Sequence, residues 1–284
     1  MFKGKMKAVT FSYDDGVTQD QRLISIFNRY DLKCTFNLNS GLLGQADMLQ
    51  REGVSVAHCK PLKEEIRGIY AGHEIASHTL THPALYALSD QEIIRQVEDD
   101  RLALSEIAGY EVVGMAYPGG TDFINEHVAS LIRNHTGIKY ARTTTSTHNF
   151  DLQADLIMFN PTVYHHFEWE ELFRLGEEFL ALKTDTPKVF YIWGHSYEFD
   201  IRQEWDRFEK FCALISHADD IYYGTNAEIL LAEHSLNFLR ELISQRNEKG
   251  GVNGFTEAIV SPFIYFDSKK LNEEITTFGF KITL

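Results

Sequence analysis

Residues 7–30, KAVTFSYDDGVTQDQRLISIFNRY, contain the pattern that decides the fold class. Lys7–Tyr13 is rich in β-branched and aromatic residues, which predicts a strand. The segment DDG at residues 14–16 interrupts this strand, because acidic residues before a glycine favour a turn. Apolar residues then recur at helical spacing and predict a helix over Gln19–Tyr30. One short stretch therefore holds a strand, a polar loop and a helix in that order.

The same order of elements recurs along most of the chain. Further strands are predicted at Cys34–Leu38, Glu74–Ser77, Glu111–Tyr117, Lys139–Arg142, Val189–Trp193 and Ile221–Tyr223, and further helices at Pro61–Tyr70, Asp90–Ala108, Asp122–His135, Glu168–Leu182, Gln203–His217 and Asn226–Arg246. Alternating strands and helices predict βα units, a parallel sheet and right-handed crossovers. About seven strands fit either a (β/α) barrel or an open doubly wound sheet. No glycine-rich phosphate motif follows the first strand, which weakens a dinucleotide-binding version.

The C-terminal segment has a different pattern. Ala258–Phe266 and Phe278–Leu284 are aromatic and β-branched, and no helix follows them. We therefore expect a barrel over residues 1–250 and a small C-terminal β extension over residues 251–284, packed on the same domain. So short a segment would have little core as a domain of its own.

The composition excludes several classes of function. The 284 residues are 44% hydrophobic, which is enough for a sizeable core, and 41 acidic and 27 basic residues give a formal net charge of −14. A nucleic-acid-binding face needs clustered Lys and Arg to displace counterions, and no such cluster is present, so we expect no nucleic-acid partner. No apolar run approaches the roughly 18 residues of a membrane span. We expect no span, and the oligomeric state stays open.

The cysteines favour a reducing compartment. Cys34, Cys59 and Cys212 are an odd number and widely spaced, so we expect no disulfide framework. Cys34 lies in an apolar run and is expected to be a packed core thiol. No signal peptide is visible, and a cytoplasmic location is the default expectation. A secreted chain without its leader would look the same.

Residues that carry chemistry follow the predicted strands directly. Asp14-Asp15 follow the first strand, His78 and His82 follow Glu74–Ser77, and His195 comes soon after Val189–Trp193. In a parallel barrel the carboxyl ends of all strands open on one face, which is where such folds assemble active sites. We therefore expect these side chains to meet.

Two histidines stand one helical turn apart in His78-Thr79-Leu80-Thr81-His82-Pro83. Pro83 restricts His82 away from helical geometry, which predicts a loop turn. Two histidines and one carboxylate form a common catalytic zinc set with a position open for water. The alternative is a turn with surface or capping histidines.

The acidic pair and His195 also have plain structural interpretations. Asp14 and Asp15 could form a turn or cap the next helix. If one carboxylate binds a cation, the other can act as a base beside metal-bound water. His195 could be a hydrogen-bonded core residue or, where the other groups converge, a proton donor.

Four motifs together resemble a known family. The segments TFSYDDG at residues 10–16, HTLTHP at 78–83, AYPGG at 116–120 and WGH at 193–195 occur in the order of the polysaccharide deacetylase family, also known as the NodB homology domain or carbohydrate esterase family 4. The resemblance spans roughly residues 7–235 and implies a distorted (β/α) barrel.

The resemblance also implies roles for individual residues. Asp14 would be the general base and His195 the general acid. Asp15, His78 and His82 would bind one divalent metal, for which we expect Zn²⁺, with Co²⁺, Mn²⁺ or Ni²⁺ as alternatives. The backbone N–H of Gly119 would help to hold the oxyanion.

The chain departs from the family pattern at several positions. Family members often carry Arg two residues before the proline of the third motif and Tyr just after it; here Ala116 and Gly119 stand there. Arg142 is a candidate replacement for the arginine that orients the base, and a surface salt bridge is the alternative. The Asp-x-x-Asp-Trp motif has no clear counterpart. Further candidates for contact with substrate or base are Tyr117, Pro118, Trp193 and Tyr197, whereas Tyr164-His165-His166 is expected to be structural or substrate-facing and not a second metal site.

The expected function is therefore a metal-dependent hydrolase that removes N-acetyl groups from an acetylated sugar, oligosaccharide or polysaccharide and releases acetate. One alternative applies the same chemistry to another non-peptide amide or ester, as in allantoinase-like relatives of the fold. A second is a carbohydrate-binding relative that has lost catalysis.

Overall fold

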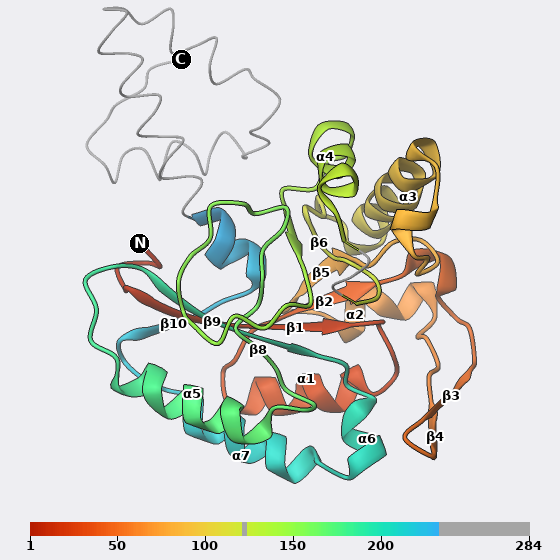
Figure 1. Cartoon of the computed structure of the whole chain (residues 1–284). Helices are drawn as coiled ribbons and strands as arrows, with labels where there is room; N and C mark the ends of the chain where they lie inside the picture. The colour runs from red at the N-terminus through yellow and green to blue at the C-terminus, as the bar shows by residue number, and fades with distance from the viewer. Residues whose placement is uncertain (121–123, 233–284) are drawn as a thin grey trace, which may run out of the picture. The chain divides into compact units, whose positions relative to one another are not determined.

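The computed structural model describes residues 1–120 and 124–232 (Figure 1). The C-terminal extension predicted at Ala258–Phe266 and Phe278–Leu284 lies outside these residues, as does the end of the helix predicted to Arg246. Residues 226–232, where that helix begins, are helical. Within the described residues, no helix is both long and apolar enough to cross a membrane.

The fold is built on one parallel sheet. Its strands are β1 (Lys7–Asp14), β2 (Cys34–Leu38), β5 (Glu74–Ser77), β6 (Gly114–Ala116), β7 (Tyr140–Arg142), β8 (Val163–Tyr164), β9 (Lys188–Gly194) and β10 (Ile221–Tyr223). The strand order is β7-β6-β5-β2-β1-β9-β8, with β10 paired to β1, and all of these pairs are parallel. The predicted parallel α/β architecture is confirmed, and every strand's carboxyl end lies at the same edge.

Helices connect the strands and cover the sheet. They are α1 (Asp20–Arg29), α2 (Ile66–Ile69), α3 (Asp90–Ala108), α4 (Glu126–His135), α5 (Trp169–Ala181), α6 (Glu198–Arg202) and α7 (Trp205–Ile215). Figure 1 shows α1, α5 and α7 along one side of the sheet and α3 and α4 on the other. Ser89 caps the N-terminus of α3, because its side chain accepts a hydrogen bond from the Glu92 N–H.

The core lies between β1, β9 and helices α1, α5 and α7. Every residue of β1 is buried, as expected for a central strand covered on both faces. Phe11 of β1 packs against Phe27 of α1, with ring centroids 4.8 Å apart. Burying one such side chain contributes about 1.5–3 kcal/mol to stability. Cys34 is buried in this core, as predicted.

The sequence interpretation missed an antiparallel hairpin. Strands β3 (Met48–Arg51) and β4 (Val54–Ala57) form a separate two-stranded sheet. Glu52 and Gly53 join them with φ of 55° and 77°, as in the tight turns that hairpins favour. Glu-Gly is a weaker turn signal than Asn-Gly, and the strands are half exposed, so their pattern is faint.

Three predicted helices have different bounds. The helix predicted at Pro61–Tyr70 is a 3₁₀ turn at Lys63–Glu65 followed by α2. The helix predicted from Gln203 begins at Trp205, because Gln203 adopts a left-handed conformation that ends the preceding, unpredicted α6. Helix α4 begins at Glu126, where the Asn125 side chain caps the Val128 N–H.

Candidate active site

The ends of β1, β5, β7 and β9 bring the predicted chemical groups together. Asp15 follows β1, and His78 and His82 follow β5. The three side chains, here called the Asp15 cluster, offer one ligand atom each within 4.8 Å of one another. His82 Nε2 lies 3.6 Å and His78 Nε2 3.9 Å from Oδ1 of Asp15. Ligand atoms of a tetrahedral zinc ion lie about 3.4 Å apart at ordinary bond lengths, so the spacing suits such an ion.

The protonation of the Asp15 cluster also suits a cation. Nδ1 of His78 donates to the Ala116 carbonyl at 2.8 Å. The other ring nitrogen, Nε2, therefore carries a free lone pair on the side of Asp15. Burial lowers the pKa of His78 to about 4, so the imidazole is neutral, as a metal ligand must be. Burial alone raises the pKa of Asp15, but the basic groups around it hold the pKa well below its usual range. These groups are His58, which donates a hydrogen bond, and His195, Lys60 and His78.

The backbone at the cluster is unusual for non-glycine residues. Asp15, Thr79 and His82 have φ of 77°, 69° and 58°, in the left-handed region. The prediction that Pro83 keeps His82 out of a helix is confirmed. Asn39 stabilises the turn by donating to the carbonyls of His78 at 2.6 Å and Thr79 at 2.9 Å. Such strain persists only where surrounding contacts enforce it, and it concentrates at functional sites.

Asp14 is buried next to the cluster and held from two sides. Asn37 donates to its Oδ1 at 2.7 Å, and Arg142 forms a close ion pair with its Oδ2. Arg142 is fully buried and also donates to Ser12 and to its neighbouring carbonyl. Its guanidinium stacks over Trp193 at 4.3 Å. Arg142 is therefore a buried ion-pair partner of Asp14, and the alternative of a surface salt bridge does not apply.

His195 follows β9 and is paired with a carboxylate that the sequence interpretation missed. Its Nδ1 lies 3.1 Å from Oε1 of Glu198, which is fully buried. Burial lowers the pKa of His195, but Glu198, Asp15 and Asp14 together raise it to about 9. The pKa of Glu198 falls to about 2 despite its burial, because of His195, His165 and His166. The spacing of three residues from His195 was the only sequence signal for Glu198.

Two further groups touch Asp15 without having been predicted. His58 Nε2 lies 3.3 Å from Oδ2 of Asp15, and Lys60 donates to the Asp15 backbone carbonyl. Both residues follow β4 of the unpredicted hairpin, so their position could not be placed from the sequence. Together they fix the carboxylate and the backbone of the residue that follows β1.

The remaining predicted residues are placed as follows. Gly119 is exposed after β6, with φ of 82°, and Pro118 before it is buried. Tyr117 is buried in a hydrophobic cluster and its hydroxyl donates to the Ile157 carbonyl, which favours a packing role. Trp193 stacks on Tyr164 at 4.3 Å. Tyr197 lies between the rings of His58 and His195, at 5.1 Å from each.

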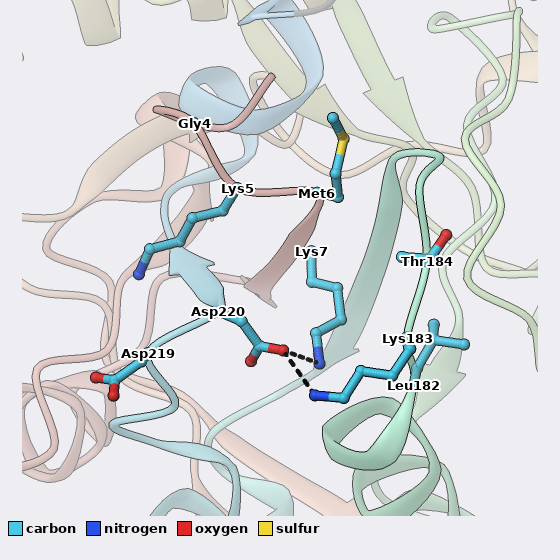
Figure 2. Close-up of a pocket in the computed structure, with 9 residues that line it drawn as sticks. All are labelled: Gly4, Lys5, Met6, Lys7, Leu182, Lys183, Thr184, Asp219 and Asp220. Atoms are coloured by element: carbon cyan, nitrogen blue, oxygen red, sulfur yellow. Dashed lines mark ion pairs between the residues drawn. The ribbon is translucent and has the colours of Figure 1, made fainter.

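A pocket of about 450 Å³ lies at the opposite end of the strands (Figure 2). Lys7 opens β1, and Asp220 immediately precedes β10. Asp220 pairs with Lys7 at 3.1 Å and Lys183 at 3.7 Å. The amino ends of barrel strands contribute to stability, whereas active sites occupy the carboxyl ends. This pocket is therefore separate from the Asp15 cluster.

Comparison with known proteins agrees with this geometry. Residues 3–141 match the family model for polysaccharide deacetylases. The chain therefore resembles the polysaccharide deacetylase family over slightly less than half of its length. It is 27% identical over 129 residues to the peptidoglycan-N-acetylglucosamine deacetylase PgdA of Listeria monocytogenes. That match covers 44% of this chain and 24% of the relative, so the chain spans about a quarter of the relative's length.

Two solved structures share the fold of this chain. A structure from Mycobacterium smegmatis named for the polysaccharide deacetylases has 19% identity and a TM-score of 0.59, with 82% of this chain and 92% of that chain covered. Puue allantoinase has 13% identity and the same TM-score of 0.59, with 80% and 89% covered. At these identities the likeness concerns the fold alone, and it confirms the distorted (β/α) barrel.

Proposed function

We propose that the chain is a divalent-metal-dependent deacetylase that removes N-acetyl groups from an acetylated sugar, oligosaccharide or polysaccharide and releases acetate. The observation that carries the proposal is the meeting of three kinds of group at the carboxyl ends of the strands. These are the Asp15 cluster, Asp14 with its arginine partner, and His195 with its carboxylate. The match of residues 3–141 to the polysaccharide deacetylase family model supports the same reaction.

Asp15, His78 and His82 would hold the metal. Two imidazole nitrogens and one carboxylate oxygen favour zinc, with cobalt, manganese or nickel as alternatives. The side chain of His82 is 38% exposed, so one side of the cluster is open to solvent and substrate. A bound divalent cation supplies a Lewis acid for the acetyl carbonyl and lowers the pKa of water from 15.7 to about 7.

Asp14 would act as the general base. Its carboxylate is fixed by Arg142 and Asn37, so it takes the proton of the attacking water without first reorganising. The water then adds to the amide carbon and negative charge develops on the carbonyl oxygen. The backbone N–H of Gly119, at the end of β6, would donate to that oxygen. One such donor contributes about 3 kcal/mol in comparable sites.

His195 would act as the general acid. Its raised pKa keeps the ring protonated at neutral pH, and Glu198 holds the ring through Nδ1. The free Nε2–H can therefore be donated to the departing amine nitrogen, which is a poor leaving group until it is protonated. Trp193 and Tyr197 are both largely buried, so they shape the walls of the site more than they offer a stacking surface for a sugar ring.

Metal analysis combined with an acetate assay tests this proposal. We expect the purified protein to release acetate from chitooligosaccharides or N-acetylglucosaminyl compounds. His78→Ala should lose about one equivalent of metal and most of the activity. His127→Ala is the matched control, because His127 is exposed on α4. Unchanged metal content in His78→Ala would contradict the metal assignment. Hydrolysis of allantoin-type amides, with no acetate released from any sugar, would contradict the substrate class.

A further inference from the structure

A second group of potential ligands lies on the far side of His195. We propose that His165, His166 and Glu198, here called the Glu198 cluster, form a second and sealed divalent-cation site. One ligand atom from each residue lies within 4.8 Å of the others. All three residues are fully buried. The site uses none of the Asp15 cluster residues, although Glu198 also contacts His195.

Unused ring nitrogens point to a ligand in this cluster. Nε2 of His165 and Nδ1 of His166 are buried, and neither has a hydrogen-bond partner among the described residues. A buried polar atom without a partner costs about 1–3 kcal/mol, so two in one place require an explanation. A bound cation satisfies both, since each nitrogen has a free lone pair when its ring is neutral.

The other nitrogen of each ring is already bound to an acceptor. Nε2 of His166 donates to Oε1 of Glu52 at 2.9 Å, and Nδ1 of His165 lies 3.3 Å from the Trp193 carbonyl oxygen. Metal-binding histidines in proteins usually donate their second nitrogen to a carboxylate or a carbonyl, because this fixes the tautomer and the ring. His78 in the Asp15 cluster has the same arrangement with Ala116.

Glu198 presents one oxygen to these histidines. Its Oε1 contacts Arg51 at 3.0 Å and also Tyr164 and His195. Its Oε2 accepts a hydrogen bond from the His195 backbone N–H at 3.1 Å and lies 3.7 Å from Nε2 of His165, which is too long for a hydrogen bond. That separation is close to the 3.6 Å and 3.9 Å found in the Asp15 cluster, and it suits two ligands of one ion.

The chemistry of the donors indicates the class of cation. Two imidazole nitrogens and one carboxylate favour zinc or a similar transition metal over magnesium or calcium, which prefer oxygen ligands. Because no ligand is exposed, the site would bind a structural ion and would not act on substrate. The ion would tie α6, which starts at Glu198, to the turn that follows β8.

Metal stoichiometry of matched variants tests the inference. We expect about two zinc equivalents in the wild-type chain, about one in His166→Gln and about one in His78→Ala/His82→Ala. His148→Gln, at an exposed histidine, is the control and should keep both. In His78→Ala/His82→Ala, added zinc should still raise Tm, and this rise should be absent when His166→Gln is combined with it.

The outcomes separate this inference from the proposed function. Two bound equivalents without acetate release would overturn the proposed function and leave the second site standing. A His78→Ala/His82→Ala protein with no bound zinc, or His166→Gln with unchanged zinc content, would overturn the second site. If His166→Gln does not fold, His165→Gln and the zinc-dependent Tm of His78→Ala/His82→Ala decide the same question.

Discussion

The Asp15 cluster and the Glu198 cluster use the same three donors in different surroundings. Each has two histidines and one carboxylate, and each has a histidine whose second nitrogen is bound to a backbone carbonyl. His82 is 38% exposed in the first, whereas every member of the second is fully buried. The first also has Asp14 beside it, held by Arg142 and Asn37, whereas the carboxylate beside the second, Glu52, accepts a hydrogen bond from His166. Solvent access and a neighbouring base, more than the donor set, therefore distinguish a reactive site from a sealed one.

The short segment His195–Glu198 connects the surroundings of the two clusters. The charges of Asp14 and Asp15 help to raise the pKa of His195, and Nδ1 of this histidine contacts Glu198 of the other cluster. Ser196 in between is anchored by its hydrogen bond to Asp20, at 2.6 Å. A change in either cluster can therefore reach the other through this segment.

The largest expected effect comes from removing the base that only the Asp15 cluster has. Asp14→Asn should lower kcat for acetate release by about 10²–10⁴-fold, because general-base catalysis supplies a factor of that size. Metal content should stay unchanged, since Asp14 is not among the three ligands. Asp99→Asn, at an exposed position in α3, is the control. Retention of full activity by Asp14→Asn would remove the main chemical difference between the clusters.

A second comparison concerns the arginine beside each cluster. Arg142→Ala leaves Asp14 buried without its cation and should cost about 3–5 kcal/mol of unfolding free energy. Arg51→Ala should cost less, about 1 kcal/mol, because Arg51 is 30% exposed and Glu198 keeps other partners. Urea denaturation of both variants measures the difference. Equal losses of unfolding free energy in the two variants would mean that burial of the ion pair does not determine its contribution to stability.

Much of the site could be predicted because parallel strands converge at one edge. Asp14, Asp15 and Arg142 each lie at or directly after a strand end, so their meeting follows from the topology once the strands are located. Arg142 is 128 positions from Asp14 in the sequence, and only the sheet brings the two together. His78 and His82 could be placed for the same reason, with Pro83 indicating the turn.

Other contacts could not be read from the sequence. His58 and Lys60, which contact Asp15, follow the unpredicted β3–β4 hairpin, so their position depends on where that hairpin ends. His165 and His166 are adjacent, and in an extended strand they would face opposite ways. Strand β8 ends at Tyr164 and a turn follows, so both rings face Glu198 instead. Such local turns depend on tertiary packing, for which one sequence gives little signal.

Glu198 belongs to the Glu198 cluster and also contacts His195, so its removal should have an intermediate effect. Glu198→Gln should lower kcat by about 10–100-fold, as is typical when a partner that orients a catalytic histidine is lost. KM should change little, and zinc should be lost from the Glu198 cluster but kept by the Asp15 cluster. Glu106→Gln, at an exposed glutamate, is the control. A raised KM with an unchanged kcat in Glu198→Gln would contradict the role of Glu198 in positioning His195.

The smallest expected effect concerns Asp20, which anchors the segment between the clusters. Asp20 is fully buried and accepts hydrogen bonds from Ser196 and, at 2.8 Å, from Tyr70. Burial raises its pKa from 3.8 to about 7, although these two donors oppose the rise. Between about pH 4 and 7 the folded state keeps a proton that the unfolded state has lost. The stabilising contribution is therefore complete below about pH 4 and is lost as the pH rises through about 7.

Asp20→Asn removes this titration while keeping a neutral side chain of the same shape. The Tm of the wild-type chain should therefore fall relative to that of Asp20→Asn as the pH rises from 5 to 8, because the linkage slope is about 1.4 kcal/mol per pH unit below a pH of about 7. The measurement is the difference between the two Tm curves, in which the titration of all other groups cancels. Asp99→Asn should show no such trend, because its carboxylate is exposed. A pH-independent difference for Asp20→Asn would mean that Asp20 is ionised in the folded chain, and that the segment joining the two clusters is held by a charge and not by a neutral hydrogen-bonded group.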